Sequence, residues 1–320
     1  MRGWTKVVGL SVIAAAVATA LAGMLWFSLY DYTFTAARTR VVYDDVERFE
    51  SVIARLPSDE RSWPSFLDEE YLARGTRGLR RYQARYGLTG ELLANMVAVD
   101  RRGWRSCRLT NYVRAVEGDI RRGLAGFEAL YPRALFPAVF FVVGRHRAGG
   151  MNEAAGIVVA AELYRDDLTN CNREATHTSS EIPCLVVHEL VHFNQATRSP
   201  IDYFRPGDNL ARAVKEGSAD FLAELAVGCH INAEAHAWGR AREAELWQAF
   251  QKILDSRDGG DWFYVKPEGQ RPQDLGYFVG YNIVRAFYER AADKERAVQQ
   301  IMNIADYGAF LAESGYAGGN

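Results

Sequence analysis

The chain contains few cysteines and few lysines, and each shortage narrows the class of protein. The four cysteines are Cys107, Cys171, Cys184 and Cys229, and none stands in a C-x-x-C pair, which argues against a cysteine-ligated zinc site. Only 5 of the 38 basic residues are lysine, but acidic residues number 40 and the net charge is −2, so the basic excess of a nucleic-acid-binding protein is missing. No internal repeat is present. The 320 residues predict a globular protein without a nucleic-acid partner.

A long uncharged segment follows Arg2 and Lys6. It runs over residues 7–30, which is long enough for one membrane-spanning helix. Its apolar character continues past the small residues 18–22, where a signal peptidase would cut, so we expect an uncleaved anchor. The positive end stays inside, which predicts a single-pass protein of a bacterial inner membrane with the remaining chain in the periplasm. Release into the periplasm after signal cleavage is the alternative.

Two histidines and a glutamate lie within the short, otherwise apolar stretch from Pro183 to Phe193. Residues i and i+4 of a helix share a face, so His188 and His192 can bind one ion, with Glu189 beside it. This is the H-E-x-x-H pattern, in which neutral imidazoles hold zinc and the glutamate takes a proton from the zinc-bound water. Pro183 suits the first turn of such a helix. The sequence therefore predicts a site for one zinc ion, with Glu189 as the catalytic base.

A second helix is expected to supply the remaining ligand. A hydrolytic zinc site needs three protein ligands and an open position for water, and Glu216, downstream of the motif, suits the third place. Asp220 follows on the same face at i+4 and is expected to accept the free N–H of a ligand histidine. Gly217 costs a helix about 1 kcal/mol relative to alanine, which a close approach to the first helix would explain. We expect this helix to begin near Asp208 and to end near Gly228.

Together the two helices resemble the gluzincin class of zinc peptidases, in which H-E-x-x-H is followed by a glutamate ligand and, four residues later, an aspartate. More narrowly, the pieces H-E-L-V-H-F-N-Q, E-G-S-A-D and L-G-Y-F-V-G-Y are similar to those of the predicted zinc-dependent protease family DUF2268, which is related to the gliding-motility lipoprotein GldB. The likeness spans roughly residues 136–316. It implies a zinc metallopeptidase of the cell envelope that acts on a peptide or protein substrate. The alternative is a catalytically silent, GldB-like scaffold or binding protein.

The third of these pieces predicts a helix over residues 272–285 with two tyrosines on one face. A peptidase of this type needs a donor outside the zinc ligands to stabilise the oxyanion, and Tyr281 or Tyr277 can supply it. Packing of both tyrosines in a helix interface is the alternative. Gly276 and Gly280, four residues apart, allow a close backbone approach.

We expect an α+β, predominantly helical fold, with a zincin-like metallopeptidase domain that contains a small sheet. The predicted division is a membrane anchor or signal segment at residues 1–30, a helical subdomain at 31–135 and the metallopeptidase domain at 136–320. Apolar, β-branched runs predict buried strands at residues 138–143 and 156–163. One of them, preferably the second, is expected to lie at the sheet edge and to pair with the substrate backbone.

Periodic apolar residues predict further helices, and three histidines outside the zinc motif need a separate interpretation. The expected helices cover residues 41–56, 92–97, 113–127, 233–254 and 293–305, followed by a loose, glycine-rich end. We interpret His146 as a solvated loop residue, and His230 and His236 as structural. If the chain is translocated, a disulfide between Cys171 and Cys184 is expected to brace the helix of the zinc motif.

Overall fold

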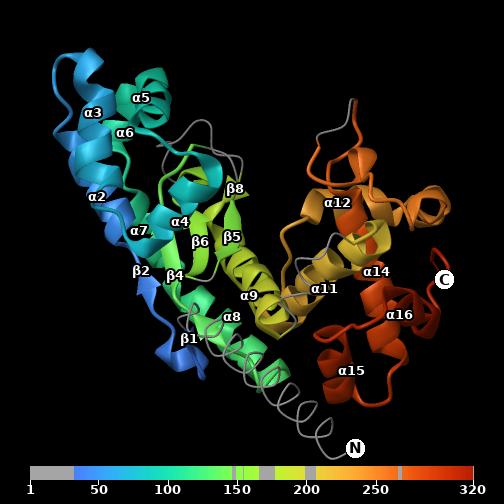
Figure 1. Ribbon diagram of the computed structural model, residues 1–320. Coiled ribbons are helices and arrows are strands. Elements are labelled where there is room, and N and C mark those ends of the chain that lie inside the picture. Colours follow the sequence, from blue (N-terminus) through green and yellow to red (C-terminus); the bar gives the residue numbers. More distant parts are fainter. Residues whose placement is uncertain are drawn as a thin grey trace, which may run out of the picture.

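The structure, a computed structural model, describes residues 32–145, 149–153, 155–165, 177–198, 207–265 and 269–319. These residues form mostly helices around a small mixed sheet, which confirms the predicted predominantly helical α+β class (Figure 1). The helices are α2 (Asp44–Ala54), α3 (Trp63–Leu67), α4 (Arg77–Tyr86), α5 (Gly90–Val99), α6 (Arg101–Ser106), α7 (Leu109–Ala115), α8 (Glu117–Leu130), α9 (Ile182–Arg198), α11 (Asn209–Val227), α12 (Ala233–Arg240), α13 (Glu243–Phe250), α14 (Leu275–Arg290), α15 (Lys294–Ile301) and α16 (Tyr307–Ser314).

The main sheet has the strand order β2-β4-β6-β5. Strands β2 (Val41–Val42), β4 (Val139–Val142) and β6 (Gly156–Ala160) run parallel, and β5 (Gly150–Glu153) is antiparallel to β6. All residues of β4 and β6 are buried, as expected of continuous apolar runs in the middle of a sheet. Two short pairs complete the strands: β1 (Tyr32–Thr33) with β3 (Phe136–Pro137), and β7 (Tyr164–Arg165) with β8 (His177–Thr178).

Strands from the predicted helical subdomain take part in these sheets. Strand β1 pairs with β3 and β2 pairs with β4, so the expected boundary at residues 135 and 136 runs between paired strands. One hydrophobic core also includes side chains from both sides of this boundary, such as Phe49 and Phe141. The N-terminal part is therefore packed into the same body as the sheet.

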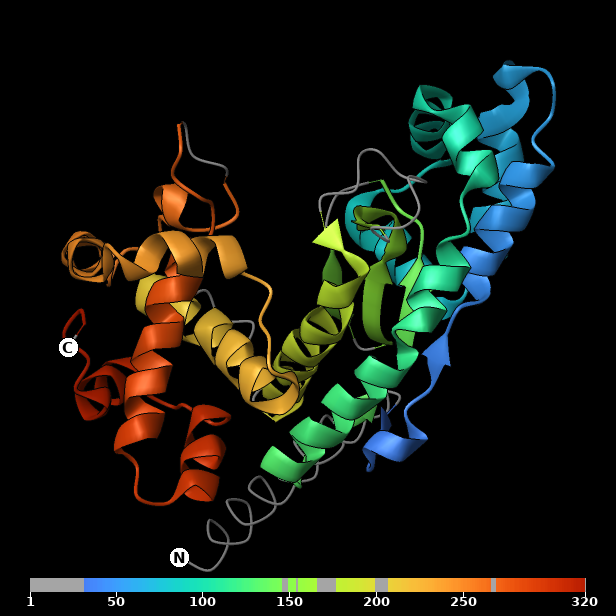
Figure 2. The same cartoon turned by 180° about the vertical axis from the view of Figure 1, so that it is seen from behind.

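Helix α11 links two groups of elements. Figures 1 and 2 show the sheet with α2 to α9 on one side of the molecule and α12 to α16 on the other, with α9 and α11 meeting in a V between them. Helix α9 packs on β5 and β6, whereas α11 packs on both α9 and α14. The histidine-bearing helix and its partner thus lie at the junction of the two groups.

The close approach predicted at Gly217 involves a different helix from the one expected. A Cβ atom on Gly217 would overlap the backbone of Gly280 and Tyr281 in α14, and one on Gly280 would overlap the backbone of Ala213 in α11. The two glycines therefore let α11 and α14 cross in backbone contact. The predicted approach of α11 to α9 through Gly217 is wrong, because this glycine faces α14.

Several of the predicted elements differ in extent. Residues 41–42 form strand β2 instead of opening the first amphipathic helix, because they pair with β4. The long helix expected over residues 233–254 is two helices, α12 and α13. Residues Tyr307–Ser314, before the glycine-rich end, form helix α16, whose first turn is capped by Asp306 and whose Phe310 packs on Phe287.

Among the helices of the described residues, none combines the length and the apolar character needed to cross a membrane. This finding contradicts the predicted single-pass location in the bacterial inner membrane. The segment on which that prediction rested, residues 7–30, lies outside the described residues.

Candidate metal centre

Helix α9 positions the H-E-x-x-H residues in the interior. Its side chains Val186, Val187, Leu190 and Val191 are fully buried, which fixes the face that remains for the polar residues. That face carries the two histidines and Glu189, all of which are themselves buried. Buried ionisable groups are costly without hydrogen-bond or ion-pair partners, so partners are expected around these three side chains.

Helix α11 brings Glu216 to the same point. The side chain of Asp208 accepts from the backbone N–H of Ala211 at 2.8 Å, and Gly228 closes the helix in a left-handed conformation with φ 82°. These are the predicted ends of this helix. Glu216 and Asp220 lie one turn apart on the face toward α9.

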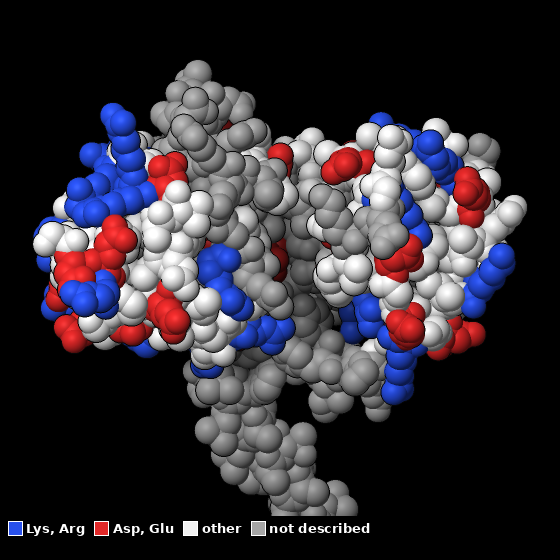
Figure 3. Space-filling model, turned by 90° about the horizontal axis from the view of Figure 1, so that it is seen from above, with Lys and Arg blue, Asp and Glu red and all other residues white. Residues whose placement is uncertain are grey.

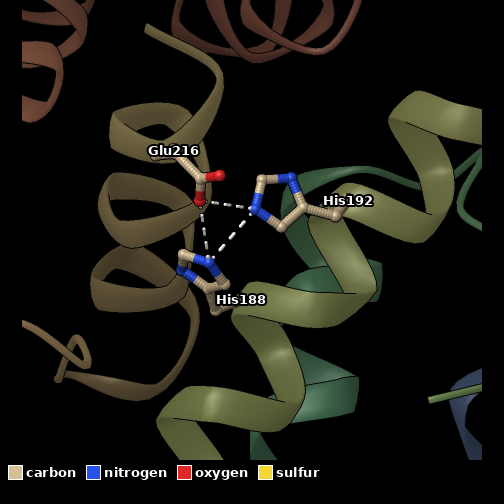
Figure 4. A group of neighbouring side chains, drawn as sticks. All are labelled: His188, His192 and Glu216. Carbon is tan, nitrogen blue, oxygen red and sulfur yellow. Dashed lines mark hydrogen bonds and ion pairs between the residues drawn. The ribbon is translucent and has the colours of Figure 1, made fainter. Parts of the chain in front are cut away.

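His188, His192 and Glu216 converge as predicted (Figure 4). The Nε2 atoms of the two histidines are 3.1 Å apart, and Oε2 of Glu216 lies 3.0 Å from Nε2 of His192 and 3.5 Å from Nε2 of His188. Bonds of about 2.0–2.2 Å to a tetrahedral zinc ion place ligand atoms roughly 3.3–3.6 Å apart. Two imidazoles and a carboxylate at this spacing therefore suit a divalent ion, and small side-chain movements would centre it.

The remaining ring nitrogens are held by hydrogen bonds. Nδ1 of His188 lies 2.8 Å from Oδ1 of Asp220, and Nδ1 of His192 lies 3.0 Å from Oε1 of Gln195. Asn232 donates to the other oxygen of Asp220 at 2.7 Å. Such partners orient the imidazoles and make their Nε2 atoms better ligands. The structure thus places Asp220 in the supporting role that the sequence predicts.

Without a metal ion, opposite charges on the histidines and on Glu216 stabilise the triad. Burial lowers the pKa of His188, but its hydrogen bonds to Asp220 and Glu216 outweigh this effect and raise the pKa to about 10. Burial likewise raises the pKa of Glu216, but the charge of His192 and the bonds to both histidines keep this pKa well below its usual value. A protonated His188 ring therefore faces one carboxylate at each nitrogen, Asp220 at Nδ1 and Glu216 at Nε2.

Glu189 is directed toward strand β5. Its Oε2 atom accepts a hydrogen bond from Nδ2 of Asn152 at 3.1 Å. Because β5 is the last described strand of the sheet and packs on α9, Glu189 lies beside a sheet edge as well as beside the two histidines. The sequence did not predict β5, whose Met151, Asn152 and Glu153 lack β-branching.

The edge strand differs from the prediction. The two predicted strands correspond to β4 and β6, and both are interior, because β4 lies between β2 and β6 and β6 lies between β4 and β5. The expectation that one of them forms the edge is therefore wrong. The chain returns after β4 to pair β5 along the outer side of β6, which hydrophobicity alone does not reveal.

Of the two predicted tyrosines, Tyr277 lies beside the triad. Its ring stacks on His188 with centroids 6.2 Å apart. The hydroxyl of Tyr281, one turn further along α14, instead donates to Oε2 of Glu224 at 2.7 Å, and its ring packs on His236. Tyr281 therefore faces a different polar cluster.

A third tyrosine, which the sequence did not reveal, contacts a predicted ligand. The hydroxyl of Tyr264 donates to Oε1 of Glu216 at 2.9 Å and is hydrogen-bonded to Tyr277. Tyr264 has a left-handed backbone with φ 60°, and its N–H donates to Asp274, which has φ 61°. Non-glycine residues in this region store strain, which concentrates at functional sites. Its loop has no periodicity, so only the tertiary structure identifies it.

One disulfide braces this region. Cys184, in the first turn of α9, is bonded to Cys229, directly after the end of α11, with Cα atoms 5.6 Å apart. The predicted bond between Cys171 and Cys184 is wrong, because Cys184 has this other partner. Cys107 is disulfide-bonded as well. Cys171 and His146 lie outside the described residues.

Seen from above, the two groups of elements are separated by a hollow, with acidic side chains visible on both of its walls (Figure 3).

Comparisons with protein-family models, with curated proteins and with solved structures found no match. The resemblance to the DUF2268 family stays a prediction that rests on the three short motifs. What the protein does must therefore be argued from the arrangement of its own side chains.

Proposed function

We propose that the protein is a zinc-dependent peptidase that hydrolyses peptide bonds. The observation that carries this proposal is the convergence of one atom each from His188, His192 and Glu216, with Glu189 on the same helix. Two neutral imidazoles and one carboxylate are a ligand set of hydrolytic zinc sites. The gluzincin-like spacing of these residues supports the same reaction.

The chain's own residues supply the acid–base chemistry. A zinc ion in the triad would act as a Lewis acid on the peptide carbonyl and acidify the attacking water. Asn152 holds Oε2 of Glu189, which leaves Oε1 to accept the proton of that water and to pass it to the leaving amine. Asp220 and Gln195 keep the histidines oriented while this proton moves.

Hydroxyl groups beside the triad would stabilise the oxyanion. Burial raises the pKa of Tyr264 and of Tyr277 above the usual value, so both remain O–H donors at neutral pH. We assign the donor role to these two residues because Tyr264 bonds Glu216 and the ring of Tyr277 stacks on His188, whereas Tyr281 bonds Glu224, outside the triad. To donate to the oxyanion, the hydroxyl of Tyr264 would turn away from Glu216. Although its hydroxyl is packed against Glu216, Tyr264 as a whole is 64 % exposed, so a substrate can reach it.

The edge strand β5 would bind the substrate backbone. Among the described residues β5 pairs with β6 alone, which leaves the backbone groups of its other side for an added strand. Asn152 on this strand contacts the catalytic base, so a peptide aligned along β5 would pass beside Glu189. A peptide or protein substrate is therefore the class that this site suits best.

Cleavage of a peptide library by purified, zinc-loaded protein tests the proposal. We expect new peptide termini with the wild type and a loss of at least about 100-fold in rate for Glu189→Gln, because general acid–base catalysis contributes that much. The matched control is Glu181→Gln. Glu181 directly precedes the same helix, but its carboxylate bonds His177 and lies outside the triad. This control is expected to keep the wild-type rate.

Two results would contradict the proposal. One is full cleavage by Glu189→Gln, because the base would then be elsewhere. The other is a wild-type protein that binds one equivalent of zinc in the triad yet cleaves nothing in the library, which is the outcome expected of a silent scaffold.

A further inference from the structure

A second group of potential ligands lies behind the first. One ligand atom each of Asp220, His230 and His236 lies within 4.8 Å of the other two. They come from α11, from the turn after it and from α12. Asp220 and His236 are buried, at 0 % and 2 % exposure, and the His230 side chain is 11 % exposed. The cluster therefore lies almost entirely away from solvent.

Several constraints hold these residues together. Gly228 turns the chain back at the end of α11, and the disulfide of Cys229 fixes the next residue, His230, near the start of α9. Asn232 donates to Oδ2 of Asp220 at 2.7 Å, which ties the same turn to α11. The ring of His236 packs edge-on against Phe278 and Tyr281. The cluster is thus fixed by covalent, polar and apolar contacts.

The two histidines carry ring nitrogens without partners. Among the described residues, neither Nδ1 of His230 nor Nε2 of His236 has a hydrogen bond, although both atoms are buried. Their rings are nearly in contact, with centroids 3.9 Å apart. Burying unsatisfied polar atoms is costly, so a partner is expected for both.

A cation supplies what this arrangement lacks. A neutral imidazole offers a lone pair on its unprotonated nitrogen, and among the described residues Nδ1 of His230 and Nε2 of His236 are the buried ring atoms that have no partner. An acceptor or a water would satisfy only a protonated ring nitrogen or one lone pair, whereas a metal ion accepts lone pairs from both rings and neutralises the adjacent carboxylate. Two imidazoles with one carboxylate suit zinc, copper, nickel or cobalt better than calcium or magnesium.

We propose that Asp220, His230 and His236 form a second site for a divalent transition-metal ion, separate from the triad of His188, His192 and Glu216. Ligand atoms of one zinc ion lie roughly 3.3–3.6 Å apart, and the three candidate atoms lie within 4.8 Å of one another, so small side-chain rotations would bring them to this spacing. Glu224 lies on the same face of α11, with its Oε2 3.9 Å from Nε2 of His230, which favours a proton on Nε2 and leaves Nδ1 of this ring for the ion.

Asp220 links the two sites. Its Oδ1 accepts from Nδ1 of His188, whereas Oδ2 faces the turn that carries His230. An ion bound behind Asp220 withdraws charge from the carboxylate and weakens its hold on the His188 ring. Occupation of the second site therefore reduces the affinity of the triad for its own ion, and by linkage the effect is mutual.

Zinc stoichiometry tests the proposal without any activity measurement. Full-length protein is dialysed against buffered zinc and its metal content is measured. Two equivalents are expected for the wild type and one for His230→Ala, for His236→Ala and for His192→Ala. None is expected for the double variant His192→Ala with His230→Ala. His177→Ala is the matched control, because His177 is a half-exposed histidine bonded to Glu181, outside both clusters, and should keep two equivalents.

The variants keep the result interpretable. His236 is buried, so His236→Ala is expected to lose stability, and thermal unfolding of each variant shows whether it is folded. His230→Ala, in the more exposed turn, provides the second measurement. One wild-type equivalent that persists in His230→Ala and disappears in His192→Ala would overturn the second site. One equivalent that disappears only in His230→Ala would instead support this site and count against the triad, and so against the proposed peptidase.

Discussion

Nδ1 of His188 and Oδ1 of Asp220 are 2.8 Å apart, although 32 residues separate them in the chain. The bond fixes which nitrogen of His188 faces the triad, because Nδ1 is already engaged. It also joins α9 to α11 at a fully buried carboxylate. The affinity of the triad for a metal ion therefore depends on a residue that does not belong to it.

We predict that Asp220→Asn lowers zinc affinity about 10–100-fold, which is the usual effect of losing a partner of a ligand histidine. The amide keeps the size of the carboxylate but removes its charge. Competition with a chelator of known affinity measures the change. Glu234→Gln, on the exposed surface of α12, is the control and should bind zinc as the wild type does. Unchanged affinity in Asp220→Asn would show that its bond to His188 is only structural.

Replacing each of the three tyrosines by phenylalanine should lower kcat to different extents. Tyr264→Phe and Tyr277→Phe each remove a hydroxyl beside Glu216 or His188, and we expect kcat to fall about 100-fold if these groups hold the oxyanion. Tyr281→Phe removes a hydroxyl that bonds Glu224 and should leave kcat within a few-fold of the wild type. Steady-state kinetics on one cleavable peptide provides the comparison. A larger loss in Tyr281→Phe than in the other two would reverse the assignment.

Zinc affinity should rise with pH. The ion needs a neutral His188, whose pKa is about 10 in the metal-free protein, so binding displaces a proton at neutral pH. Below that pKa the apparent affinity is expected to increase about tenfold per pH unit. Calorimetry in buffers of different ionisation enthalpy measures the released proton directly. In Asp220→Asn the dependence should be flatter, because the hydrogen bond that raises this pKa is weakened.

The raised pKa of His188 also predicts how the stability of the metal-free protein changes with pH. The pKa of His188 is raised from an ordinary value of 6.5 to about 10 by folding. The resulting stabilisation is complete below the unfolded value and is lost as the pH rises through the folded value. Metal-free protein should therefore lose unfolding free energy between about pH 7 and pH 10, as denaturant titrations can show. A constant or rising stability over this range would contradict the charged state of the triad.

Gly217→Ala should destabilise the protein. Helix propensity alone favours alanine by about 1 kcal/mol, but its Cβ would overlap the backbone of α14, and overpacking typically costs about 1–3 kcal/mol or more. The matched control is Gly118→Ala in α8, an exposed position where only the side chain of Arg122 lies near the new atom, at 3.6 Å. This control should gain up to about 1 kcal/mol. Chemical denaturation distinguishes the two, and a stabilised Gly217→Ala would show that the helices are not in backbone contact.

The sequence predicted those features of the site that depend on residues close to one another in the chain. Helical periodicity brings His188 and His192 to one face, and the cap at Asp208 and the turn at Gly228 fix the bounds of α11. Glu216 and Asp220 are four residues apart, so the sequence also predicts that both carboxylates lie on one face of α11. These features depend on neighbours within a turn or two, so one chain suffices to predict them.

The tertiary structure decided every feature that depends on long-range pairing. It placed β5 at the edge, joined Cys184 to Cys229, turned Gly217 toward α14 and directed Tyr281 to Glu224. It also brought Tyr264 to Glu216 from a loop without a pattern. The reason is that such contacts arise from packing between elements, whose free energy is shared among many side chains and leaves no fixed spacing in the sequence.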